Sequence, residues 1–184
     1  MPLSIYSKLP VFSYFLLLCY DERSGKSAND DEKDEWRGAG LDEHRKEWNT
    51  SLVRLSNRLA DLERLHVSLE EIGARSAWPE RIIRDLTLAA EELLTNTISY
   101  GFPGGGEQEI VMTVHAAAGF IELSLEDGGV PFNPLESEDP DITLGVDERR
   151  IGGLGVYFAK QLVDSMEYER TPGGRNRIRL RKTY

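Results

Sequence analysis

The chain of 184 residues is long enough for one folded domain with a short additional segment. Its formal net charge of -10 argues against direct nucleic-acid binding, because neutralising phosphates requires clustered Lys and Arg on a basic surface. The single cysteine, Cys19, excludes an internal disulfide and any cysteine-based zinc site, which favours a reducing, cytoplasmic compartment.

The first 47 residues are expected to form an N-terminal extension or linker. The apolar run from Val11 to Tyr20 is too short to span a bilayer, and no cleavage signal follows it. Three interpretations stay open: an element docked on the domain, a weak membrane or secretion signal, or residues translated from upstream of the natural start. We favour the first or the third and expect no membrane contact. Residues 21–47 are highly charged and poor in apolar side chains, which is typical of a linker.

The expected domain covers residues 48–184 and begins with a short edge strand over residues 50–55. A helix follows, capped by Asn57 or Asp61, with apolar side chains at a helical period and an end at Gly73. Pro79 opens a second helix, which runs to about Tyr100 before the helix-breaking glycine and proline that follow.

The second half of the domain is expected to be rich in strands. Alternating apolar residues over 110–114 and 120–126 predict a hairpin. A loop over 127–150, a helix over 155–165 and a hairpin of 166–170 with 177–181 complete the chain. This order predicts an α+β fold, a two-layer sandwich of a mostly antiparallel sheet with helices on one face. The basic side chains near the C-terminus occupy mostly alternate positions, so we expect them on the solvent face of an edge strand.

The second helix carries a carboxylate and an amide on one face. Glu92 and Asn96 are four residues apart, which places their side chains one helical turn from each other. Asn96 also continues the apolar row of the helix, where a polar group needs a partner. Taken alone, this pattern is more typical of a helix end with ordinary surface charges at Glu91 and Glu92. The neighbouring Glu91 lies on another face and is expected to be dispensable for any chemistry.

Two glycine-containing segments follow predicted elements in positions that suit a ligand. Asp127-Gly128-Gly129-Val130-Pro131-Phe132 comes after a strand, where the glycines allow a close backbone approach and the carboxylate can accept a bond from an amino group. The segment from Arg149 to Gly155 comes before a helix, where N–H groups, the helix dipole and two arginines suit phosphate. The simpler alternatives are an ordinary turn and a flexible connector. The acidic stretch between them is long enough for a lid.

Together, Glu92 with Asn96, Asp127-x-Gly129 and Gly153-x-Gly155 resemble the N, G1 and G2 boxes of the GHKL ATPase superfamily, which includes histidine kinases, Hsp90, gyrase B and MutL. The resemblance covers roughly residues 48–184. It is strongest to the stand-alone anti-sigma-factor serine/threonine kinases of the RsbW type.

This resemblance implies an ATP site that uses Mg²⁺. Asn96 would ligate the metal, and Glu92 would act as the general base toward a serine hydroxyl or water. Asp127 would bind the adenine amino group and Gly129 would line the base pocket, while Gly153 to Gly155 would hold phosphates under a lid of residues 133–150. The remaining residues assigned to nucleotide binding by position are Tyr100, Phe132, Arg150, Gly152 and Leu154.

The function implied is an ATP-dependent protein serine/threonine kinase that phosphorylates a STAS-domain antagonist and sequesters a partner such as a sigma factor. Further implied partners are a phosphatase and a second copy of the chain in a homodimer. The chain departs from the family in two places: Tyr100 replaces a frequent histidine, and Asn176 replaces a threonine of related ATPases. Tyr100 motivates an alternative, a nucleotide-dependent binding switch without phosphotransfer.

Overall fold

The computed structural model describes residues 48–136 and 154–184 of the chain. The predicted extension over residues 1–47 and most of the predicted lid lie outside this part, and the predicted domain boundary at residue 48 stays a prediction. In chain order the elements are β1 (Asn49–Ser56), α2 (Asp61–Arg75), α3 (Glu80–Tyr100), β2 (Glu109–Ala117), β3 (Phe120–Asp127), the short 3-10 helix η5 (Pro134–Glu136), α4 (Leu154–Leu162), β4 (Ser165–Arg170) and β5 (Asn176–Thr183).

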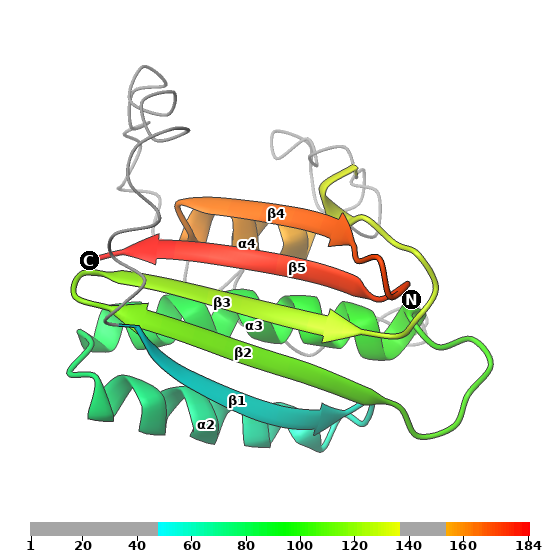
Figure 1. Cartoon of the computed structure of the whole chain (residues 1–184), viewed down its shortest axis with the longest axis horizontal. Coiled ribbons are helices and arrows are strands. Elements are labelled where there is room, and N and C mark those ends of the chain that lie inside the picture. Colours follow the sequence, from blue (N-terminus) through cyan, green and yellow to red (C-terminus); the bar gives the residue numbers. More distant parts are fainter. Residues whose placement is uncertain (1–47, 137–153) are drawn as a thin grey trace, which may run out of the picture. The chain divides into compact units, whose positions relative to one another are not determined.

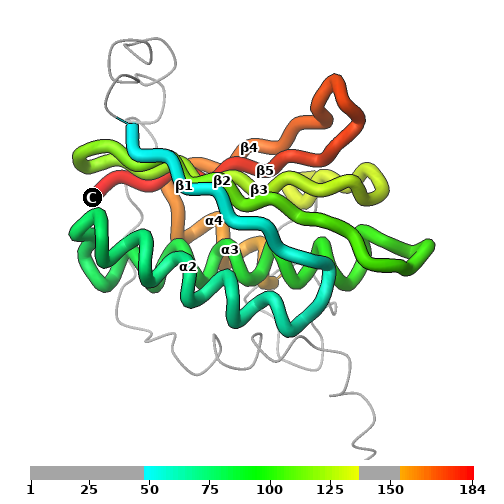
Figure 2. The backbone as a smooth tube through the Cα atoms, turned by 60° about the horizontal axis from the view of Figure 1, so that its bottom comes forward, coloured from blue at the N-terminus to red at the C-terminus, as the bar shows by residue number. Residues whose placement is uncertain are grey.

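The five strands form one antiparallel sheet in the order β1-β2-β3-β5-β4. Figures 1 and 2 show α2, α3 and α4 on the same face of this sheet, with α3 between the other two. The opposite face carries no described helix. The predicted α+β sandwich and the predicted order of its elements are therefore confirmed.

The core lies between the sheet and the helices, because the alternating apolar residues of the strands and the apolar rows of the helices point into the same layer. In β2 and β3 every second residue is buried, as expected for strands with one covered face. In α3 the predicted apolar row of Ile82, Leu86, Ala89 and Leu93 is buried. The largest fully buried side chains come from both layers: Leu65, Leu69, Leu86, Leu94, Ile110, Met112, Val114, Ile121, Leu123 and Leu180.

The predicted end of α2 at Gly73 is wrong, because α2 continues to Arg75. Gly73 is buried inside the helix, and a Cβ atom there would lie 2.6 Å from the side chain of Ile83 and 3.1 Å from that of Trp78. The glycine thus allows α2 and α3 to pack closely. Its role is close packing, not the end of the helix that the sequence predicted.

The predicted cap of α2 is also wrong. The residue preceding the helix is Ala60, which offers no side-chain cap. Asn57 instead exchanges hydrogen bonds with the turn before β2, through Gly106 and Gln108, and Asp61 accepts a hydrogen bond from the backbone N–H of Ser56. At the other end of the domain, the helix predicted over 155–165 stops at Leu162, because residue 165 already belongs to β4.

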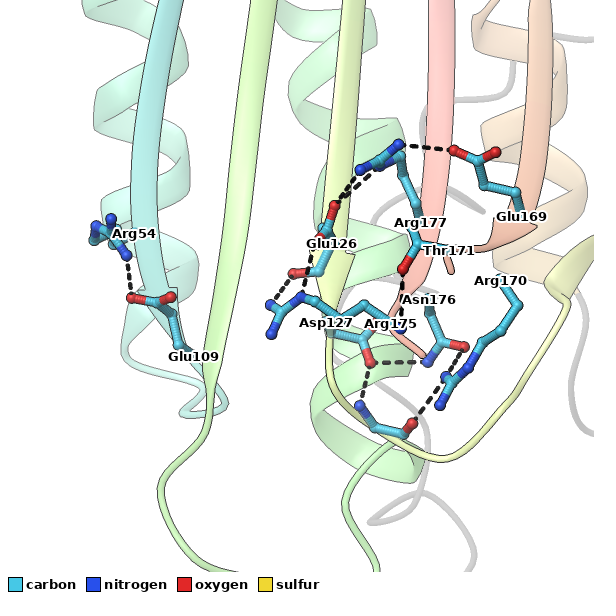
Figure 3. Close-up of polar contacts among 11 residues, drawn as sticks. Arg54, Glu109, Glu126, Asp127, Glu169, Arg170, Thr171, Arg175, Asn176 and Arg177 are labelled. Carbon is cyan, nitrogen blue, oxygen red and sulfur yellow. Dashed lines mark hydrogen bonds and ion pairs between the residues drawn. The ribbon is translucent and has the colours of Figure 1, made fainter. Parts of the chain in front are cut away.

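Of the basic residues near the C-terminus, Arg177, Arg179 and Arg181 lie on the open face of the sheet, but not on an edge strand as predicted, because they belong to β5, which runs between β3 and β4. Arg170 ends the edge strand β4, and Lys182 is buried. The interior position of β5 gives each arginine of the strand acidic partners on its neighbours, as Figure 3 shows for Arg177, which contacts both Glu126 and Glu169. We call this set the charged ladder; it consists of Arg177, Arg179 and Arg181 of β5, Glu122 and Glu126 of β3, and Glu167 and Glu169 of β4.

Candidate functional site

A pocket opens where the C-terminal part of α3 meets the turn after β3 and the β4–β5 hairpin. Its polar lining residues come from α3, the end of β3 and the β4–β5 hairpin: Asn96, Thr97, Asp127, Tyr168 and Asn176. Its apolar lining, which suits the faces of a flat ring, consists of Leu93, Val130, Phe132, Pro134 and Ile178.

Glu92 and Asn96 meet as their spacing predicts. The Nδ2 group of Asn96 donates a hydrogen bond of 3.0 Å to Oε1 of Glu92. Glu92 is only 7% exposed, and burial raises the pKa of its carboxyl group above the ordinary value, opposed by the Asn96 hydrogen bond and reinforced by the charge of Glu91. A carboxyl group with a raised pKa accepts a proton more readily than an ordinary glutamate does. Glu92 itself is not among the lining residues, so it adjoins the pocket through Asn96.

Gly155, in the first turn of α4, lies directly against Glu92. A Cβ atom on Gly155 would come within 1.9 Å of the Cδ atom of Glu92 and within 2.3 Å of both carboxylate oxygens. No side chain other than hydrogen fits between α4 and this carboxylate. The glycine therefore lets α4 approach the Glu92 carboxylate closely, in addition to the phosphate contact that its place in the sequence predicts.

Glu91 is not a surface charge, since it is only 8% exposed. Its Oε2 atom lies 2.7 Å from Nε2 of His66 on α2. The two adjacent glutamates thus face different helices, Glu91 toward α2 and Glu92 toward Asn96 and α4. The predicted register of α3 is confirmed, whereas the interpretation of both glutamates as exposed charges is wrong.

Asp127 closes the opposite side of the pocket in a tightly constrained turn. The backbone N–H of Gly129 donates a 2.7 Å hydrogen bond to Oδ1 of Asp127. A Cβ atom on Gly129 would lie 2.5 Å from the carbonyl oxygen of Gly101 and 2.8 Å from Asp127 Oδ1. The next residue, Val130, donates its N–H to the same Gly101 carbonyl at 2.8 Å. Gly129 is therefore required for the turn to approach the end of α3.

Asn176 is a pocket residue that the sequence did not identify as one. It lies opposite Asp127 in the β3–β5 register, and its Nδ2 group donates hydrogen bonds to Asp127 Oδ1 at 2.9 Å and to the Val130 carbonyl at 3.0 Å. The sequence shows Asn176 only as a departure from threonine. Strand register was needed to place it, and the lining residue Tyr168 was missed for the same reason.

The other predicted site residues divide into three groups. Phe132 lines the pocket and is 48% exposed, so its ring is available to a ligand. Tyr100 is 66% exposed and is not among the lining residues, and Leu154 is half-buried at the start of α4. Arg150, Gly152 and Gly153 lie outside the described residues.

Asn96 is suited to a magnesium ion that is completed by ligand oxygens. Within residues 48–136 and 154–184 no group of three or more His, Cys, Asp or Glu side chains could hold a metal ion alone. Mg²⁺ usually keeps waters and binds through few protein ligands plus phosphate oxygens. Because Nδ2 of Asn96 faces Glu92, its Oδ1 atom is left as the ligand atom. The residues present fit such an ion.

The described part of the chain contains no helix that is both long and apolar enough to cross a membrane. An antiparallel sheet with helices on one face, a buried carboxylate–amide pair on the middle helix and an aspartate turn at the pocket define the class of histidine-kinase-like ATPase domains. Residues 55–182 match the family model described as "Histidine kinase-like ATPase domain". The chain belongs to this family.

Two relatives are named as protein kinases that act on serine or threonine. The chain is 29% identical over 105 residues to the serine/threonine-protein kinase BtrW of Bordetella bronchiseptica, covering 57% of this chain and 74% of that protein. It is 31% identical over 106 residues to the serine-protein kinase RsbW of Listeria innocua, covering 55% and 67%. Among solved structures, the RsbU and RsbW domains of Rv1364c from Mycobacterium tuberculosis match with a TM-score of 0.48 and 17% identity, over 73% of this chain and 32% of that one.

Proposed function

We propose that this chain binds Mg-ATP in the α3 pocket and transfers the γ-phosphoryl group to a serine or threonine of a protein partner. The observation that carries the proposal is the Glu92–Asn96 pair, a buried carboxyl group of raised pKa hydrogen-bonded to an amide whose oxygen is left to bind a metal ion. The named serine-protein kinases among the relatives support it.

Asp127 is assigned to the base of the nucleotide. Its Oδ1 atom already accepts hydrogen bonds from Gly129 and Asn176, so Oδ2 is left to accept one from the amino group of adenine. The apolar lining residues Phe132, Val130 and Ile178 would enclose the ring. Gly129, which the sequence assigns to the base pocket, allows the turn after Asp127 to pack against Gly101.

Asn96 is assigned to the metal and Glu92 to the proton. When bound, Mg²⁺ neutralises charge on the phosphates. Glu92 would accept the proton of the attacking hydroxyl, and Asn96 would orient its carboxylate by the Nδ2 hydrogen bond. Phosphate binding by Gly153, Gly155 and Arg150 remains a prediction that completes this assignment.

The partner assigned is a STAS-type antagonist, whose hydroxyl receives the phosphoryl group, with a sigma factor as the protein that is sequestered. This assignment places the chain in the cytoplasm. It rests on the likeness to RsbW-type kinases.

A second candidate is a nucleotide-dependent binding switch that transfers no phosphate. The position of Tyr100 favours it, because this exposed ring takes the place of a histidine frequent in the family and lies outside the pocket lining. Partner binding that depends on ATP, without phosphorylation of the partner, would support the switch.

Nucleotide binding is tested by isothermal titration of the full chain with Mg-ADP and Mg-ATP, beside Asp127→Asn. In that variant the amide oxygen is expected to face the Gly129 and Asn176 donors, so that its NH₂ group meets the adenine amino group. The loss of one charge-assisted hydrogen bond predicts an affinity about 10- to 100-fold lower. Absence of binding to the unmodified chain would reject both candidate functions.

Kinase activity is tested by incubation with Mg-ATP and a cognate STAS protein. Serine phosphorylation that Glu92→Ala abolishes would establish the kinase. Phosphotransfer that is undiminished in Glu92→Ala would reject the assigned base.

A further inference from the structure

A network of side chains from the β4–β5 hairpin supports Asp127 at the edge of the pocket. Arg170, Asn176 and Asp127 are paired in succession across β4, β5 and β3, at the last rung of the three strands. Figure 3 shows Arg170 and Asp127 on opposite sides of Asn176. We propose that Arg170 and Tyr168 are positioning residues: by orienting Asn176 and Asp127, they make the pocket select a purine that bears a 6-amino group. This inference rests on the proposed nucleotide site.

The orientation of the Asn176 amide is fixed by its neighbours. On one side, Oδ1 accepts hydrogen bonds from Arg170 Nη1 at 2.6 Å and from the Tyr168 hydroxyl at 2.8 Å. A guanidinium group can only donate hydrogen bonds. On the other side, Nδ2 donates to the carboxylate of Asp127 and to the carbonyl of Val130, which can only accept. In a flipped amide, the NH₂ group would face the Arg170 donor, and the oxygen would face the acceptor oxygens of Asp127 and Val130.

This orientation determines what Asp127 offers to a ligand. With Nδ2 of Asn176 and the N–H of Gly129 both on Oδ1, that oxygen has two donors, and Oδ2 is the acceptor that remains. An exocyclic amino group can donate to Oδ2, whereas the 6-oxo group of hypoxanthine or guanine would bring an oxygen against an oxygen. The penalty for leaving such a buried group unpaired is the basis of selectivity.

Arg170 also holds the turn itself, because its Nη1 atom donates to the carbonyl of Gly129 at 3.1 Å. One guanidinium group therefore bonds both the amide that orients Asp127 and the backbone that follows Asp127. Arg175, five residues later, has no such role: its guanidinium contacts Glu126 on the open face. The hairpin contributes to base selection through Arg170 and Tyr168 without requiring either residue to touch the phosphates.

The test compares ADP with inosine 5′-diphosphate, which differs from ADP in carrying a 6-oxo group. Dissociation constants of both Mg complexes are measured by titration for the unmodified chain, Arg170→Met, Tyr168→Phe and the double variant. Arg179→Met, which removes an arginine of the charged ladder, is the matched control. Melting temperatures show whether each variant is folded, and Arg170→Lys tests whether a restored donor rescues selectivity.

We expect the unmodified chain to prefer ADP, and the double variant to lose about 10-fold of that preference through weaker ADP binding, as one hydrogen bond to a charged group predicts. Arg179→Met is expected to retain the preference, and Arg170→Lys to recover part of it. Equal weakening of both nucleotides, or an unchanged preference, would overturn the positioning role while leaving the proposed function intact. Absence of ADP binding to the unmodified chain would overturn the proposed function and this inference together.

Discussion

Replacing Gly155 with alanine tests the contact between α4 and the assigned base. The added Cβ atom would lie 1.9 Å from Cδ of Glu92, whereas carbon atoms in contact are about 3.5 Å apart or more. The carboxylate therefore has to retreat by about 1.6 Å. Because a misplacement of about 1 Å can reduce a rate about 100-fold, we expect kcat for phosphotransfer to fall by about that factor.

The same substitution should leave the fold intact. Alanine favours a helix over glycine by about 1 kcal/mol, which offsets part of the clash, and the displaced atoms are the end of a flexible side chain. Phosphorylation of a cognate STAS protein gives kcat, and thermal unfolding gives stability. The matched control is Gly104→Ala, since a Cβ atom at Gly104 has no neighbour within 4 Å.

Two results would refute this reasoning. A Gly155→Ala variant whose kcat stays within about 3-fold of the unmodified chain, while Glu92→Gln retains only a small residual rate, would show that the position of the carboxylate is not critical. A further loss of about 10-fold or more from that residual rate when Gly155→Ala is added to Glu92→Gln would show that the glycine acts through another group, because substitutions that remove the same interaction are not additive.

Three other predictions concern the glutamates of α3. Glu92→Gln removes a charge whose burial is unfavourable, so thermal unfolding should show a gain of about 1 kcal/mol together with loss of phosphotransfer; an unchanged or lower melting temperature would contradict this. The pKa of Glu92 is higher in the folded than in the unfolded chain, so its contribution to stability is greatest below the unfolded pKa and is lost as pH rises through the folded pKa. Phosphotransfer needs the ionised carboxylate and should appear over that same rise in pH. A pH–rate profile whose acid limb matches an ordinary glutamate would contradict this prediction. Glu91→Ala removes the partner of His66 and should lower the free energy of unfolding by about 1–3 kcal/mol in denaturant titration, while kcat stays within about 3-fold. A loss of kcat as large as that of Glu92→Ala would show that the assignment of the base is wrong.

Local patterns predicted most of the fold. Alternation over 110–114 and 120–126 marked the central hairpin, and the four-residue spacing of Glu92 and Asn96 predicted that they share one face of α3, where the structure joins them by a hydrogen bond. These features depend on residues close in the chain, so the sequence contains them directly.

Features that depend on distant pairing were not accessible in the same way. The insertion of β5 between β3 and β4 is a choice of topology, and it converts an expected edge strand into an interior one. The same pairing brings Asn176 to Asp127. Gly73 was misinterpreted because a glycine that ends a helix and a glycine that admits a neighbouring side chain are identical in sequence.

The charged ladder has a consequence for how a polyanion approaches the domain. Its three arginines are paired with four glutamates on the open face of the sheet, which leaves little net charge there. Residues 21–47 hold ten acidic and six basic side chains, and residues 133–148 hold six acidic and no basic ones, so these two segments account for the whole formal charge of -10. The formal charges of the rest of the chain sum to zero, so any net long-range repulsion of a nucleoside triphosphate comes from these two segments.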